Sequence, residues 1–109
     1  MDVNTISGIR KRDGSLAAFD AGKIASALAR AGAASGELGE ADAGRLAAQV
    51  VRVVEHRHRG RTPGIEDIQD TVEYILIAAD YVATARAYIV YREQHKRLRA
   101  DRRTVVDVA

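Results

Sequence analysis

The chain contains no cysteine among its 109 residues. Thiol nucleophiles, disulfides and cysteine-ligated zinc sites are therefore excluded for this sequence. It also has no tryptophan and one phenylalanine, while alanine is abundant, which favours closely packed helices over a bulky aromatic core. There is no signal-peptide pattern and no uninterrupted apolar run approaching about 18 residues, so we expect a cytoplasmic protein without a membrane partner.

Patterns that would support chemistry are also missing. Neither the phosphate-loop pattern G-x-x-x-x-G-K-[ST] nor G-x-G-x-x-G occurs, so ATP hydrolysis has no support. His56 and His58 are two residues apart and do not share a helix face, and His95 is the only other histidine. The acidic residues between 66 and 73 fit the favoured charge at a helix start better than acid–base catalysis. We therefore expect no catalytic residue and no metal site, and a chain that is not an enzyme.

The N-terminal segment predicts a β-hairpin. Strands are expected over 5–11 and 15–19, because the Asp13-Gly14 pair between them is a strong signal for a two-residue turn. The pairs expected from such a turn are Lys11 with Leu16, Ile9 with Ala18, and Arg10 with Ala17. A lone ribbon of this kind is marginally stable in water and must pack on something else.

Apolar residues spaced for one helix face predict four helices after the hairpin. The expected spans are from the Asp20 cap to Gly32, from Ala41 to His58, from Ile65 to Ala79, and from Val82, behind Asp80 as a candidate cap, to Leu98. Residues 33–40 are predicted to be a loop, a short third strand is expected within 60–65, and 99–109 is expected to be a tail or linker. The sum is a helical bundle capped by a β ribbon.

The stretch IRKRDGSLAAFDAGKI, residues 9–24, combines basic side chains with a helix start. Lys11 and Arg12 flank the hairpin turn, and Lys23 lies in the first turn of a helix, where positive charge is disfavoured unless an anion binds. Gly22 leaves backbone N–H groups uncovered, and such donors at a helix start bind phosphate readily. We predict a polyphosphate site here. The alternative is an exposed ribbon with solubilising charges. The net charge of only +2 does not require a nucleic-acid-binding role.

Three stretches, IRKRDGSLAAFDAGKI, IEDIQDTVEYIL and TARAYIVYREQHKRL, resemble the ATP-cone domain in order and spacing, over residues 6–98. The extended last stretch, YREQHKRLRADRRTVVDV, is most similar to the start of anaerobic (class III) ribonucleoside-triphosphate reductases. The resemblance implies an α+β, mainly α fold: a four-helix bundle capped by a three-stranded ribbon over 1–98. It implies binding of ATP or dATP as allosteric effectors, with Mg²⁺ as a candidate companion ion, in a domain that controls overall reductase activity.

The resemblance also implies a set of nucleotide-binding residues. Phosphates would be held by Lys11, Arg12 and Lys23, the base would be enclosed by Ile9, Ile24 and Ala27, and the pocket edge would be formed by Gly64, Ile65 and Gln69. Gly64 stands where the family usually has threonine or serine, so a hydroxyl contact to the ligand is lost.

The resemblance leaves partners and context open. A whole reductase needs active-site cysteines, so the chain is either the N-terminal domain of a reductase or a free-standing cone. Expected partners are adenine nucleotides, a reductase catalytic domain, and a second copy in an effector-dependent oligomer. The alternatives are a cone-type transcriptional regulator of reductase genes, whose HKRLRADRR segment would meet the DNA backbone, and a degenerate cone that serves as an interaction module. Nucleic acid is not the expected partner.

Overall fold

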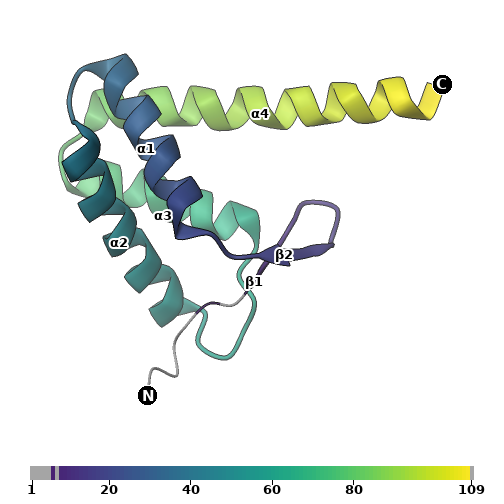
Figure 1. Cartoon of the computed structure of the whole chain (residues 1–109), viewed down its shortest axis with the longest axis horizontal. Helices are drawn as coiled ribbons and strands as arrows, with labels where there is room; N and C mark the ends of the chain where they lie inside the picture. Colours follow the sequence, from purple (N-terminus) through teal and green to yellow (C-terminus); the bar gives the residue numbers. More distant parts are fainter. Residues whose placement is uncertain (1–5, 7, 109) are drawn as a thin grey trace.

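The computed structural model describes residue 6 and residues 8–108, with side chains described as far as residue 98. These residues form four helices and one two-stranded antiparallel sheet. In chain order the elements are β1 (Gly8–Arg10), β2 (Leu16–Ala18), α1 (Ala21–Ser35), α2 (Glu40–Arg57), α3 (Ile65–Ala78) and α4 (Val82–Val108) (Figure 1). The predicted α+β, mainly α class with four helices is confirmed.

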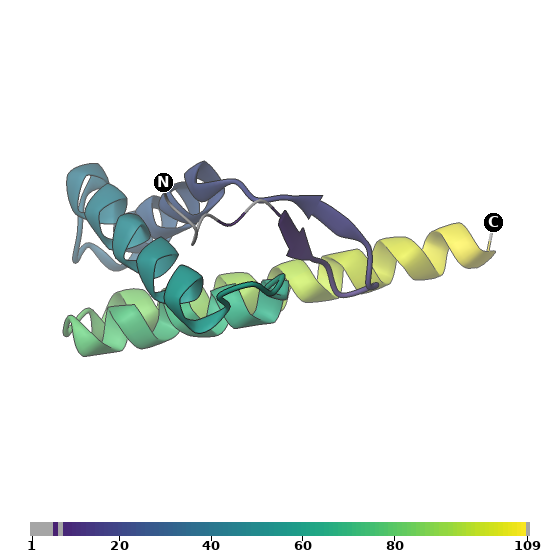
Figure 2. The same ribbon diagram turned by 90° about the horizontal axis from the view of Figure 1, so that it is seen from below.

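The four helices form a closed ring of contacts, in which α1 and α3 each pack on both α2 and α4. The hairpin extends from the N-terminal end of α1 on one side of this bundle, and the C-terminal half of α4 projects beyond the other helices (Figures 1 and 2). No described helix is both long enough and apolar enough to cross a membrane.

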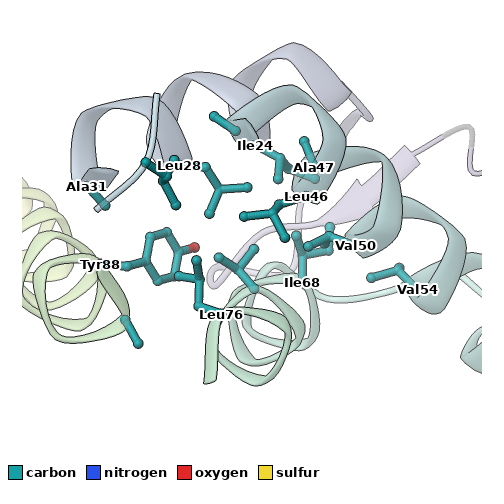
Figure 3. Packing of buried hydrophobic residues seen from close by; sticks show 14 residues of the cluster. Ile24, Leu28, Ala31, Leu46, Ala47, Val50, Val54, Ile68, Leu76 and Tyr88 are labelled. Atoms are coloured by element: carbon teal, nitrogen blue, oxygen red, sulfur yellow. The ribbon is translucent and has the colours of Figure 1, made fainter. Parts of the chain in front are cut away.

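The core lies where the apolar faces of the four helices meet (Figure 3). Leu28, Leu46 and Leu76 are 1% exposed or less, and each comes from a different helix. Burying a leucine of this kind contributes roughly 1.5–3 kcal/mol relative to leaving it in water. The remaining buried apolar residues are Ile24, Ala31, Leu38, Ala43, Ala47, Val50, Val54, Ile68, Val72, Ala85 and Tyr88. The periodic stripes of the sequence therefore predicted most of the buried faces of α1, α2 and α3, although Ala79 at the end of the α3 stripe is exposed.

The hairpin forms as expected, but its register differs by one residue from the predicted one. The pairs are Gly8 with Ala18, Ile9 with Ala17, and Arg10 with Leu16. The Lys11 N–H donates to the Ser15 carbonyl at 2.8 Å, the Gly14 N–H donates to the Lys11 carbonyl at 2.9 Å, and Gly14 has a φ of +88°. This is a three-residue loop with glycine in the left-handed position rather than a two-residue turn. Residues 5 and 7 of the expected first strand lie outside the described residues.

The expected third strand is reduced to a single parallel bridge between Arg10 and Gly64. The Arg10 N–H donates to the Pro63 carbonyl at 2.9 Å. The ribbon therefore has two strands, not three, in the part of the chain that the structure describes. Proline has no N–H to donate, so Pro63 cannot extend a ladder. The bridge is nevertheless what ties the hairpin to the beginning of α3.

The end of α1 differs from the prediction, because Gly32 does not stop the helix. α1 continues to Ser35, and Gly36 ends it with a φ of +78° and an N–H that donates to the Gly32 carbonyl at 2.8 Å. Gly32 is buried inside the helix, where Leu38 packs directly against it. Glycine therefore serves two different purposes here: close packing at Gly32 and the left-handed cap at Gly36.

Asp80 also has a different role from the predicted one. It has a φ of +68° and belongs to the end of α3, where its N–H donates to the Ile77 carbonyl and the Tyr81 N–H donates to the Leu76 carbonyl. These two bonds form the Schellman arrangement that closes a helix. The start of α4 is instead satisfied by Glu37, whose Oε1 accepts from the Thr84 N–H at 2.6 Å and from the Thr84 hydroxyl at 2.7 Å.

The Glu37 contact predicts a specific dependence of stability on pH. The side-chain hydrogen bond from Thr84, followed by the backbone hydrogen bond from Thr84, lowers the pKa of Glu37 below the ordinary 4.5. A lowered folded-state pKa gives stability that is present above the unfolded pKa and lost as pH falls through the folded pKa. We expect Glu37→Gln to be less stable than wild type by a constant amount near neutral pH, with the difference shrinking below about pH 4.5.

Urea unfolding of both proteins between pH 7 and pH 3 measures this difference. Glu93→Gln serves as the control, because the Glu93 carboxylate lies 3.8 Å from Arg97 on an exposed face and such pairs contribute little. A Glu37→Gln deficit that does not change with pH would show that the charge of Glu37 is irrelevant to the cap.

The predicted tail is helical in this structure. α4 runs without a break to Val108, past the expected end at Leu98. The backbone of residues 99–108 therefore continues the direction of α4 instead of leaving it as irregular chain. The continuous helix does not test whether the domain ends at residue 98, so that boundary stays a prediction.

Candidate functional site

A groove of about 420 Å³ lies between the hairpin and the beginning of α3. Its lining comes from two segments far apart in the sequence: Arg10, Lys11 and Arg12 from the hairpin, and Gly64, Ile65, Glu66 and Asp67 from the start of α3. The bridge between Arg10 and Gly64 holds the two sides together. The basic segment of the hairpin is therefore placed against a helix N-terminus, where backbone N–H groups and the helix dipole favour anions.

The N-terminus of α3 is stabilised locally in the absence of a capping hydroxyl. Gly64 is the N-cap residue, and its N–H donates to Asp67 Oδ2 at 2.9 Å. The same carboxylate oxygen lies 3.5 Å from His58 Nε2, and the His58 Nδ1 lies 3.2 Å from the Val54 carbonyl. His58 thus links the end of α2 to the lip of the groove. This link was not predicted from the sequence.

Arg12 is the most constrained basic residue of the groove. Its Nε lies 3.4 Å from Glu66 Oε1, and its Nη2 donates to Gln69 Oε1 at 3.1 Å. The Arg12 side chain is 25% exposed, against 57% for Glu66. The predicted site residue Gln69 is therefore brought to Arg12 rather than left on a distant helix face. Lys11 is exposed and lies beside Arg12 on the groove lining.

Lys23 occupies the predicted position but not the same groove. Asp20 caps α1 as expected, with its Oδ1 accepting from the Gly22 N–H at 2.9 Å. Lys23 is exposed in the first turn of α1, and that turn contains no acidic residue to offset its charge. Among the described residues, those that line the hairpin groove do not include Lys23. The structure therefore keeps the third predicted phosphate ligand on a separate helix start.

The three apolar residues expected around a base are largely part of the core. Ile24 is 8% exposed and belongs to the central cluster, while Ile9 and Ala27 are partly buried and pack against it. They leave little free surface for a ligand in this conformation. Ile65, which is half-buried on the groove lining, offers the more accessible apolar surface.

A second, smaller groove of about 230 Å³ shares Arg12 with the first. Its lining joins the hairpin to α3 and α4 through Arg12, Glu66, Glu73, Ile89, Arg92, Glu93 and Lys96. Arg92 is held by Asp70 at 2.8 Å and Glu73 at 2.7 Å. In the sequence Lys96 belongs to the basic segment HKRLRADRR, and a place for it in a groove with Arg12 was not predicted. Its position beside Arg12 depends on how α4 crosses the bundle, and no local sequence signal indicates it.

The sequence was compared with known protein families to identify the domain that contains these grooves. Residues 7–97 match the ATP cone domain. The chain belongs to the ATP-cone family. The match covers the hairpin, the first three helices and most of the described side chains of α4, so both grooves of this ATP cone lie within it.

The relatives of this ATP cone are ribonucleotide reductases of several classes. A vitamin B12-dependent ribonucleoside-diphosphate reductase of Mycobacterium tuberculosis is 36% identical over 99 residues, which is 91% of this chain and 14% of the relative. An anaerobic ribonucleoside-triphosphate reductase of Haemophilus influenzae is 36% identical over 95 residues, covering 87% and 13%. The reductase subunit alpha of Chlamydia pneumoniae is 33% identical over 106 residues, covering 91% and 10%.

These comparisons confirm the resemblance to the ATP cone and to the anaerobic enzymes. They also extend it, because the vitamin B12-dependent enzymes match over a similar share of the chain. The chain spans about one seventh of the length of the mycobacterial relative and less of the others. The comparisons therefore do not show that this chain has the activity of those whole proteins.

Proposed function

We propose that this ATP cone binds ATP and dATP as effectors and regulates a ribonucleotide reductase. One observation carries the proposal: in a chain of this family, Lys11 and Arg12 line a groove against the N-terminus of α3. Arginine and lysine beside exposed backbone N–H groups form a favourable environment for a polyphosphate. Glu66 and Asp67 lie on the same lining, so the nucleotide would bind together with Mg²⁺, which would screen the phosphates from these carboxylates.

The proposed ligand set combines two helix starts. Lys11 and Arg12 would bind phosphates in the hairpin groove, with Gly64, Ile65 and Gln69 at its edge. Lys23 would reach the same ligand from the first turn of α1, and Ile9, Ile24 and Ala27 would contact the base where the hairpin meets α1. Because Ile24 is buried in the core, contact between Ile24 and the base requires side chains around Ile24 to move when a nucleotide binds.

Regulation would follow from a change in how the domain associates. An effector shifts an equilibrium only by its differential affinity for two states. The proposed states are alternative packings of the cone on a second cone or on a reductase catalytic domain. In this proposal the partners are adenine nucleotides and reductase chains, and the cytoplasmic location stays a prediction.

Calorimetric titration of the purified chain with ATP, dATP and GTP tests the proposal, with size-exclusion chromatography of each end point. We expect ATP and dATP to bind more tightly than GTP, and one of the two adenine nucleotides to change the elution volume. Absence of binding of all three at millimolar concentration would refute effector binding by this chain. Binding without a change of size would refute regulation through self-association and leave contact with a catalytic domain as the mechanism.

A further inference from the structure

We propose that Glu66 competes with the ligand's phosphates for Arg12, and thereby determines how strongly the groove prefers highly charged ligands. This inference rests on the proposed function, because it concerns the same groove. In the structure Glu66 Oε1 lies 3.4 Å from Arg12 Nε, and both side chains line the groove. A carboxylate and a phosphate oxygen make the same kind of charge-assisted contact with arginine.

The two carboxylates of the groove are not equivalent. Asp67 accepts from the Gly64 N–H and lies 3.5 Å from His58 Nε2, so it is engaged in holding the α3 start. Among the interactions of the described side chains, Glu66 has one partner, Arg12, which is itself a proposed phosphate ligand. Glu66 is therefore the carboxylate whose partner must be shared with a ligand. Gln69, at 3.1 Å from Arg12 Nη2, can retain Arg12 without adding charge.

The charge balance gives the consequence of this arrangement. The lining contains three cationic side chains, Arg10, Lys11 and Arg12, and two carboxylates, Glu66 and Asp67. When a polyphosphate binds Arg12, Glu66 loses its partner and remains beside a negative ligand. The repulsion grows with the charge of the ligand. Removing the charge of Glu66 should therefore improve the binding of ATP more than the binding of AMP.

Titration of wild type and Glu66→Gln with ATP and with AMP in buffer without Mg²⁺ tests this inference, because bound Mg²⁺ would cancel the charge difference between the two nucleotides. We expect the ATP dissociation constant of Glu66→Gln to be about 3–10-fold lower than that of wild type, and the AMP constant to change less than about twofold. The difference for ATP should shrink at high salt, because exposed charges are screened. Glutamine keeps the size of the side chain, and thermal unfolding verifies that the variant is folded.

Glu40→Gln is the matched control. Glu40 lies in the first turn of α2, so this variant loses the same helix-dipole interaction without touching the groove. It should bind both nucleotides as wild type does. If wild type binds ATP and Glu66→Gln binds it equally or more weakly, Glu66 positions Arg12 instead of competing for it, and the inference is wrong while the proposed function stands. If neither protein binds ATP, both fail together.

Discussion

Replacing Gly32 with alanine is expected to lower the free energy of unfolding by about 1–3 kcal/mol, the usual range for adding a methyl group to a filled core. A Cβ atom at Gly32 would lie 2.5 Å from Leu38 Cδ1, 2.6 Å from Leu38 Cγ and 2.8 Å from the Leu38 carbonyl oxygen. The side-chain atoms could move, but the carbonyl belongs to the backbone of the loop between α1 and α2. Leu38 is 8% exposed and cannot rotate away without opening the core.

Urea unfolding followed by circular dichroism measures this effect, and Gly44→Ala provides the matched control. Gly44 lies inside α2, and a Cβ there would meet no atom within 4 Å. Alanine is a better helix former than glycine, so Gly44→Ala should raise the free energy of unfolding by about 0.5–1 kcal/mol. The same substitution thus has opposite signs at the two sites. Equal effects at both would show that Leu38 does not pack against Gly32 in solution.

Lys23→Ala is expected to weaken the binding of both ATP and dATP by about 10–100-fold, the range for losing one charge-assisted contact to phosphate. The reason is the position of Lys23 in the first turn of α1, exposed and without an acidic neighbour in that turn. Stability should be unchanged or slightly higher, because a positive charge at a helix N-terminus is unfavourable. Calorimetry gives the affinities, and thermal unfolding gives the stability.

Arg30→Ala controls for the loss of one positive charge from the same helix. Arg30 is exposed two turns further along α1 than Lys23. The Arg30→Ala variant is expected to bind nucleotide within about twofold of wild type, since exposed charges at that distance are screened. If Lys23→Ala binds ATP as tightly as wild type, the nucleotide site is confined to the groove between the hairpin and α3. If both variants lose affinity equally, the effect comes from net charge alone.

Local signals in the sequence predicted the helices well. The apolar stripe that contains Ile68, Val72 and Leu76 predicted the buried face of α3, and Asp20 predicted the start of α1. These features depend on residues within one or two turns of each other, because periodicity and capping are properties of a short stretch of chain. The basic pair in the hairpin was likewise visible without any structure.

The positions of glycine and aspartate were harder to interpret, because each residue type has several uses. Gly32 and Gly36 are both plausible helix ends in the sequence, but only the packing of Leu38 makes Gly32 an internal contact. Asp80 is a good cap for a following helix, yet its positive φ assigns it to the end of α3. Asp13-Gly14 fixed the place of the turn but not its length, so the register was wrong by one residue.

The contacts that hold Arg12 in the groove depended on the tertiary structure. Arg12 meets Glu66 and Gln69 across separations of 54 and 57 residues. No periodicity or capping rule connects positions so far apart, because their approach is set by the bridge between Arg10 and Gly64 and by the packing of α3 on the bundle. The sequence alone determined that the hairpin is basic and that it precedes a capped helix. The resemblance to the ATP cone already implied that Gly64, Ile65 and Gln69 lie at the edge of the same pocket. Only the fold decided that the Glu66 carboxylate and the Gln69 amide hold Arg12.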